Sequence, residues 1–181
     1  MRRKPYLWSL FKSILLALIL VLIINTWFFK PVKVIGNSMF PTLQDGQQGF
    51  SSVFALNTQG LKRFDVVVVK ADDDYLVKRV IGLPNETIEF NNEQLLINGQ
   101  VVDQYFLNQQ HVDQLKQSYI QFTADFGPIT IANDEYFLMG DNRPLSIDSR
   151  FSQYGPFKED AIISKDLYVV YPFSQFKKVG H

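Results

Sequence analysis

The feature that most constrains this chain is an apolar segment close to its start. Residues 7–29 are nearly all apolar, and the run from Ile14 to Ile24 contains no polar residue. About 20 consecutive apolar residues are enough to span the hydrocarbon core of a bilayer as a helix. Trp8 and the aromatic residues of 27–29 lie at the two ends of the run, where interfacial aromatic side chains are expected. The segment therefore predicts a single transmembrane helix.

A cleaved secretory signal is the alternative, because it shares the basic start of this segment. The apolar run is long, however, and it ends in the bulky residues 27–29 rather than in small residues suited to cleavage. The basic cluster 2–4 predicts a cytosolic N-terminus. We therefore expect residues 1–29 to form a short cytosolic tip and an anchor in the cell membrane, in contact with lipid. Residues 30–181 should form one extracytoplasmic domain.

Composition beyond the anchor excludes several functional classes. Residues 30–181 contain 14 basic and 18 acidic residues, so this domain does not attract phosphate backbones and we expect no nucleic-acid partner. The chain has no cysteine, which excludes disulfides, cysteine nucleophiles and thiolate metal sites. Its two histidines, His111 and His181, lie in a polar stretch and at the chain end. Neither suits a serine–histidine–aspartate triad, and we expect neither a metal nor a cofactor.

Short strand patterns dominate the rest of the chain and predict a mainly β domain. One segment departs from this pattern. Residues 104–128 are rich in glutamine and carry only a weak helical stripe, so we interpret them as a small polar insertion on the rim of the β core. The expected strands cover 32–36, 64–70, 75–82, 86–90, 94–97, 129–132, 135–139 and 167–171.

Three polar segments contain the candidates for chemistry. Residues 36–43 (GNSMFPTL) place Ser38 after a Gly–Asn turn, and residues 140–150 (GDNRPLSIDSR) hold two aspartates, two arginines and two serines. Taken singly, the first is a strand end with a turn and the second is a polar surface loop. The density of opposite charge in the second segment nevertheless favours a fixed network of ion pairs and hydrogen bonds.

The third segment is 75–82 (YLVKRVIG), in which Lys78 and Arg79 interrupt an apolar strand. Strand alternation sends these two side chains to opposite faces, so a sheet covered on both sides buries at least one of them. An edge strand with both charges solvated is the alternative. A buried lysine has a lowered pKa and can accept a proton near neutral pH. Ser38 and Lys78 are therefore the most economical nucleophile and base in a chain without a suitable histidine.

Taken together, these segments resemble a known family. GNSMFPTL, RFDVVVVK, YLVKRVIGLPNETIEF and YFLMGDNRPLSIDSRFSQYGPF are similar, in that order, to the sequence boxes of bacterial type I signal peptidases, in a short form like that of Gram-positive bacteria. The similarity covers the anchor and most of residues 32–157. It implies a compact antiparallel β-sheet, or half-barrel, and a membrane-bound serine endopeptidase that removes signal peptides from exported precursor proteins. The family preference implies small residues at positions −1 and −3 of the precursor.

The resemblance also assigns roles to matching residues. Ser38 would be the nucleophile, and its backbone N–H would help to form the oxyanion hole. Lys78 would be the general base, and Ser146 would orient the lysine amine. One branch of the family has a serine two residues before the nucleophile, where this chain has Gly36, so the second oxyanion donor is left open.

The remaining matches are structural residues and pocket residues. Asp148 matches an acid that pairs with Arg150 and Arg79, and Asp141 is expected close to the same network. The apolar residues that flank the dyad would line the substrate pocket, and the large size of most of them predicts a shallow one. They are Val34, Met39, Leu43, Leu76 and Val77.

The distance along the chain between the anchor and Ser38 supports a substrate at the membrane. Ser38 follows Phe29 by nine positions, a tether of at most roughly 30 Å, which suits precursors that are themselves held in the bilayer. Two alternatives are a catalytically silent assembly factor at the cell surface and a self-cleaving regulator of the SOS-repressor type. The first would lack the serine or the lysine, and the second would need a different N-terminal domain.

Overall fold

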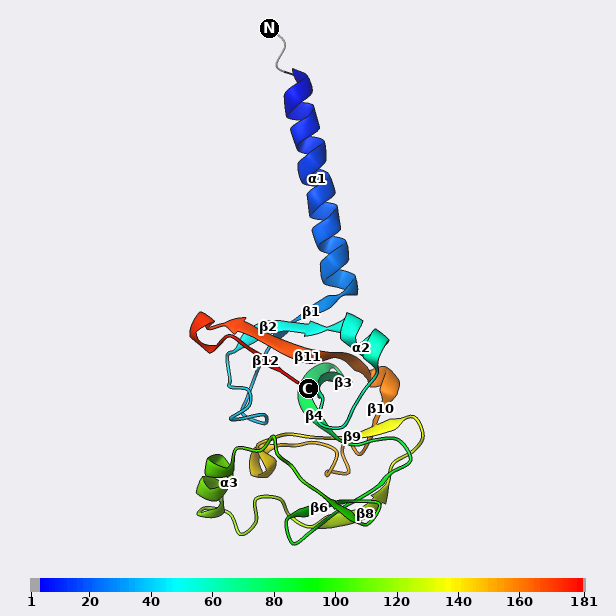
Figure 1. The fold of residues 1–181 in the computed structure, drawn as a ribbon, viewed down its shortest axis with the longest axis vertical. Coiled ribbons are helices and arrows are strands. Elements are labelled where there is room, and N and C mark those ends of the chain that lie inside the picture. The colour runs from blue at the N-terminus through cyan, green and yellow to red at the C-terminus, as the bar shows by residue number, and fades with distance from the viewer. Residues whose placement is uncertain (1–3, 181) are drawn as a thin grey trace.

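The N-terminal segment forms one long helix that stands apart from the rest of the molecule. The computed structural model describes residues 4–180, so Arg2, Arg3 and His181 lie outside it, as do the side chains of 4–5 and 25–27. Helix α1 spans Lys4–Trp27 and projects from the β domain (Figure 1). Its segment Tyr6–Ile24 is long and apolar enough to cross a membrane, with none of it buried inside the structure.

The helix passes into the sheet without a linker. Strand β1 spans Phe29–Lys33, so Phe29, which the sequence places at the end of the anchor, is already the first residue of a strand. The Phe28 carbonyl accepts a hydrogen bond from the Val53 N–H at 2.9 Å. Its ring stacks on Phe54 with the centroids 5.5 Å apart. These contacts attach the end of α1 to helix α2 (Val53–Gln59).

The larger sheet is antiparallel and curls into an open half-barrel (Figure 1). Its strands follow the order β1-β2-β11-β3-β4-β9-β10, and β12 pairs with β11. Beyond β1, these strands are β2 (Gln48–Ser52), β3 (Val66–Ala71), β4 (Asp74–Gly82), β9 (Glu135–Met139), β10 (Phe157–Lys158), β11 (Ile162–Tyr171) and β12 (Lys177–Val179).

A smaller antiparallel sheet with the order β7-β6-β5-β8 packs against the end of the larger one. It consists of β5 (Thr87–Asn91), β6 (Gln94–Ile97), β7 (Gln100–Val102) and β8 (Phe126–Thr130). Helix α3 spans Gln109–Lys116 between β7 and β8. The 3-10 turns are η1 (Arg143–Leu145), η2 (Glu159–Ala161) and η3 (Phe173–Gln175).

The mainly β prediction is confirmed, and its errors have local causes. The expected strand 32–36 ends at Lys33 because the chain turns at Gly36, whose φ of +81° favours glycine. The expected insertion 104–128 includes the start of β8. Strand β2 and helix α2 were not predicted, because Gln48–Ser52 has little strand pattern. The Ser52 hydroxyl that caps α2, accepting from the Ala55 N–H, is a weak signal in the sequence.

Three apolar clusters form the core and surround β3 and β4. One lies between the two sheets, around Ile81, Ile88 and Phe137. A second lies on one face of β3 and β4, and a third lies below the turn that carries Ser38. The third cluster consists of Val34, Met39, Leu43, Val66, Leu167, Val169 and Val179, with Val32 and Val77 at its edge.

Candidate active site

Strand β4 buries two adjacent cations. Lys78 is 3% exposed and Arg79 is 4% exposed. The sequence required only one of them to be buried, whereas the structure buries both. Because neighbouring side chains of a strand point to opposite faces, each cation has its own surroundings. The edge-strand alternative is wrong, since β4 pairs with β3 on one side and with β9 on the other.

Arg79 is held in a complete set of contacts. Its guanidinium donates to both carboxylate oxygens of Asp141, at 2.8 and 2.6 Å, and to the Phe64 carbonyl at 2.8 Å. The Phe106 ring lies 4.2 Å from its Cζ. The resemblance had implied that Asp148 pairs with Arg79. In the structure, Arg79 pairs with Asp141 instead. Arg79 points to the face of β4 opposite Lys78, and Asp141 contacts it there.

The loop that follows β9 folds around Asp148, which is fully buried. One carboxylate oxygen of Asp148 accepts from the Gly140 N–H at 2.9 Å and from the Ser146 hydroxyl at 2.7 Å. The other accepts from Arg150 Nε at 2.7 Å. Burial alone would raise the pKa of Asp148, but the hydrogen bond and charge of Arg150, together with the hydrogen bonds from Gly140 and Ser146, outweigh it, so the pKa is lowered. The loop is thus organised around an ionised carboxylate.

Lys78 lies at the inner side of this loop. Its Nζ donates to Ser146 Oγ at 3.1 Å, the contact expected of an orienting serine. Burial lowers the pKa of Lys78 to about 8, and the negative charge of Asp148 opposes this shift only in part. A substantial fraction of the amine is therefore neutral at mildly alkaline pH. Such an amine can act as a base.

The turn after β1 brings Ser38 to the same loop. The Ser38 carbonyl accepts from the Asn142 N–H at 3.0 Å, and the Asn142 side chain donates to the Asn37 carbonyl at 2.9 Å. Among the described residues, the Ser38 hydroxyl makes no hydrogen bond, and the Lys78 amine bonds to Ser146. Catalytic hydrogen bonds are often long before substrate binds. Ser38 and Lys78 thus contact the same loop, at Asn142 and at Ser146.

Gly140 makes this approach possible, a role that sequence reasoning missed. A Cβ at this position would lie 2.3 Å from Ser146 Oγ and 2.4 Å from the Ser38 carbonyl oxygen. A side chain at position 140 would therefore separate the turn that carries Ser38 from the 140–150 loop. Gly140 opens the polar box directly after an apolar strand, and this position was the available signal.

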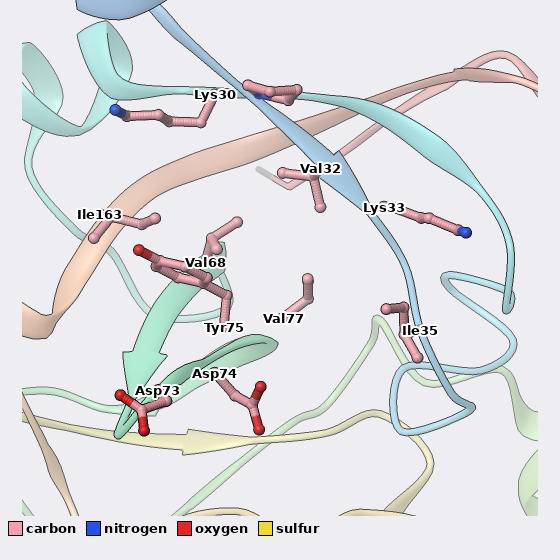
Figure 2. A pocket seen from close by; sticks show the side chains of 11 residues that line it. Lys30, Val32, Lys33, Ile35, Val68, Asp73, Asp74, Tyr75, Val77 and Ile163 are labelled. Carbon is pink, nitrogen blue, oxygen red and sulfur yellow. The ribbon is translucent and has the colours of Figure 1, made fainter.

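A groove of about 590 Å³ lies between β1 and the β3–β4 hairpin (Figure 2). Two of its lining residues, Ile35 and Val77, lie three residues before Ser38 and one residue before Lys78 in the chain. Its charged rim, Lys30 and Lys33 on one side and Asp73 and Asp74 on the other, was not predicted from the sequence. The apolar walls and floor come from Pro31, Val32, Ile35, Val68, Tyr75, Val77 and Ile163.

The five predicted pocket residues do not form a single wall. Val34, Met39 and Leu43 are buried in the third core cluster, and Val77 packs on that cluster while lining the groove. Leu76 packs on the second cluster instead. The reason is strand alternation, since Leu76 and Val77 are neighbours on β4 and point to opposite faces. Leu76 is therefore removed from the predicted pocket, and the other four remain a prediction.

Within residues 4–180, no group of three or more histidine, aspartate or glutamate side chains could hold a metal ion. His111 contacts the Phe40 ring edge-on, with the centroids 4.9 Å apart, instead of approaching Ser38 as a base. The polar side chains gathered at the 140–150 loop thus include Lys78, Ser146, and Asp141 and Asp148 with their arginines. This set can perform acid–base chemistry at a serine.

An apolar N-terminal helix that could span a membrane, an antiparallel β domain, and a loop that contacts both Ser38 and a buried lysine suit a membrane-associated hydrolase. Comparison with known proteins defines it further. The family model for signal peptidase, peptidase S26, matches residues 7–171. The chain belongs to this family, and it is a hydrolase of the signal peptidase I type.

Individual relatives cover nearly the whole chain. Signal peptidase I S of Bacillus subtilis is 38% identical over 93% of this chain and 91% of its own length. Signal peptidase I P of Bacillus subtilis subsp. natto is 40% identical over 92% of this chain and 90% of its own length. A crystal structure of a signal peptidase I from Enterococcus faecalis matches with a TM-score of 0.49 and 28% identity. It covers 58% of this chain and 95% of that one.

Proposed function

We propose that this enzyme removes the signal peptides of exported precursor proteins, with Ser38 as the nucleophile and Lys78 as the general base. The observation that carries the proposal is the setting of Lys78, which is buried, has a pKa lowered to about 8 and is held by Ser146. A serine needs a neutral base within reach. The imidazole of His111 packs on the Phe40 ring instead.

The reaction follows from these groups. Ser38 Oγ attacks the carbonyl carbon of the scissile peptide while Lys78 Nζ accepts its proton. The same ammonium then protonates the leaving amine, and a water molecule, deprotonated by Lys78, hydrolyses the acyl-enzyme. Within residues 4–180 the Ser38 N–H donates to no acceptor, so it can stabilise the oxyanion. The Gly36 N–H already donates to Asp45 at 2.7 Å, so the second donor must be another group.

The rate should depend on pH through Lys78. Only the neutral amine can accept the proton of Ser38, so the rate should rise with pH through an apparent pKa near 8, the lowered value of Lys78. The measurement is kcat/KM on a signal-peptide substrate as a function of pH, which reports groups of the free enzyme. A rate that kept rising through the ordinary lysine value of 10.5 would contradict the burial argument.

The groove supports an extended substrate. Strands β1 and β4 flank it; Ser38 follows β1 in the chain, and Lys78 lies on β4. A peptide placed between them would form main-chain hydrogen bonds that are independent of sequence. Its alternate side chains, at positions −1 and −3, would then point into the enzyme. The apolar residues Val77 and Ile35 line the groove and are the lining residues closest in sequence to Lys78 and Ser38, so the space left for these side chains should be shallow.

Leucine in place of alanine at position −1 should therefore slow cleavage at least about tenfold, because an oversized side chain forces packed walls to move at about 1–3 kcal/mol. The same exchange at position −2 should have little effect, since that side chain points away from the enzyme. A peptide series varied at one position at a time tests both statements. Equal rates for alanine and leucine at −1, or dominance by position −2, would overturn this binding mode.

The placement of the anchor supports a site at the outer membrane surface. The domain division proposed here is residues 1–29 in the cytosol and membrane and residues 30–181 outside. Helix α1 enters β1 directly, and Phe28 joins it to α2, so the tether has little freedom. Phe28, Phe29, Phe50 and Phe54 are exposed beside the end of α1, where aromatic side chains favour the lipid interface. Precursors held in the same bilayer would meet the groove there.

A further inference from the structure

Arg143 is a buried arginine that the reaction above does not use. It is 1% exposed. Its Nε donates to the Gly140 carbonyl at 3.0 Å, and its two terminal nitrogens donate to Thr123 Oγ1 at 3.2 Å and Gln104 Oε1 at 2.5 Å. The Phe90 ring lies 5.3 Å from its Cζ. Gln104 and Thr123 both belong to the glutamine-rich insertion, one before α3 and one after it.

The charge of Arg143 is held by neutral oxygens. Across residues 4–180, Arg79 and Arg150 have carboxylate partners within ion-pair distance, whereas Arg143 has none. Burial lowers the pKa of Arg143, yet an arginine with three acceptors stays protonated. A buried cation without a counter-ion depends strongly on each acceptor, because an unmet N–H carries its full desolvation cost.

These contacts reach the dyad through Gly140. Arg143 fixes the Gly140 carbonyl, and Asp148 accepts from the Gly140 N–H at 2.9 Å. The Cα of Gly140 lies against Ser146 and Ser38, as the space for a Cβ shows. The backbone of Gly140 sets how closely the turn that carries Ser38 approaches the 140–150 loop. Arg143 therefore connects this backbone to Gln104 and Thr123 of the insertion.

The insertion also contacts the nucleophile turn directly. His111, on α3, packs edge-on against Phe40, two residues after Ser38, with the ring centroids 4.9 Å apart. In Figure 1, α3 lies below the light-blue turn after β1 and beside the gold turn of the catalytic loop. The insertion thus contacts both of the segments that Gly140 brings together.

We propose that residues 104–128 are a positioning element for the Ser38–Lys78 pair, with Gln104 and Thr123 as the residues that act through Arg143. The proposal rests on the proposed function and extends it to a part of the chain without a role so far. Loss of the two acceptors should free the Gly140 peptide and admit water to Lys78. The amine would then be both misplaced and better solvated.

The test is a double variant, Gln104→Met with Thr123→Val, which keeps both side-chain sizes and removes both acceptors. We expect kcat to fall about ten- to a hundredfold, the effect of misplacing reacting groups by about 1 Å, with KM nearly unchanged. The lower apparent pKa of the pH–rate profile should rise above 8, because Lys78 becomes solvated while Asp148, Asp141 and Arg150 still face it. A second double variant, Gln104→Glu with Thr123→Val, keeps an acceptor at position 104 and should recover activity.

Gln59→Met is the matched control, since Gln59 is an exposed glutamine of α2, outside the insertion. It should leave both kcat and the profile unchanged. The pKa of Lys78 is also read without substrate, by NMR titration of protein carrying 13C-labelled lysine. A double variant that is folded, as active as wild type and unshifted in the Lys78 pKa would overturn the proposal. A loss of activity in the double variant that only matches the fraction of unfolded protein would also overturn the proposal. If the wild type cleaved no precursor, the proposed function would fail, and the NMR shift would still decide the positioning role.

Discussion

Ser38→Ala and Lys78→Ala should each abolish precursor cleavage while the domain stays folded. The two side chains act as one unit, so losing either removes nearly the whole contribution of the pair. The chain offers no substitute. It has no cysteine, and His111 is packed on Phe40. Lys78→Met should give the same loss with less disturbance of packing, because methionine nearly fills the space of the buried lysine stem.

The measurement for this pair is single-turnover cleavage of a labelled precursor, with folding checked by thermal melting. Ser152→Ala and Lys70→Ala serve as controls, since both side chains are exposed, and each should retain full activity. Retention of more than about a thousandth of the wild-type rate in Ser38→Ala or Lys78→Ala would count decisively against the dyad.

Asp148→Ala should lower both stability and activity. Asp148 is fully buried and accepts from Arg150, Gly140 and Ser146, so its removal leaves a partly buried guanidinium without its counter-ion. Breaking one partner of a buried pair typically costs about 3–5 kcal/mol. Activity should fall as well, because Ser146 loses the acceptor that orients it toward Lys78.

Denaturant unfolding and cleavage rates, measured on the same preparations, test this role. Lys116→Ala is the comparison, since it breaks the exposed pair between Lys116 and Glu93. Such surface pairs contribute about 0–1 kcal/mol. If Asp148→Ala lost activity with an unchanged free energy of unfolding, Asp148 would belong to the chemistry rather than to the scaffold.

The sequence was most informative where one side chain determines the environment or the chemistry. The unbroken apolar run predicted α1, and strand alternation around Lys78 and Arg79 predicted opposite faces for the two cations. The absence of cysteine and of a suitable histidine directed attention to a serine and a lysine. Each of these arguments uses residues that are neighbours in the chain, whose relative directions follow from backbone geometry.

The sequence was least informative where a contact joins distant segments. The partner of Arg79 is Asp141, 62 residues away, whereas the resemblance had implied Asp148, the other acid of the loop. The division of Leu76 and Val77 between two clusters became clear only when both faces of β4 were known. The role of Gln104 and Thr123 depends on Arg143, 39 and 20 residues away. Their polar surroundings gave no periodic signal.

The most direct test of the central claim is incubation of the purified full-length protein in detergent micelles with a signal-bearing precursor. Mass spectrometry of both products identifies the bond that is cut. We expect a single cut directly after the signal peptide, following a small residue at position −1 with another at −3. The cut should persist with chelators and thiol reagents and be absent with Ser38→Ala. An intact precursor, a cut elsewhere, or a cut that Ser38→Ala also makes would contradict a signal peptidase that works through Ser38 and Lys78.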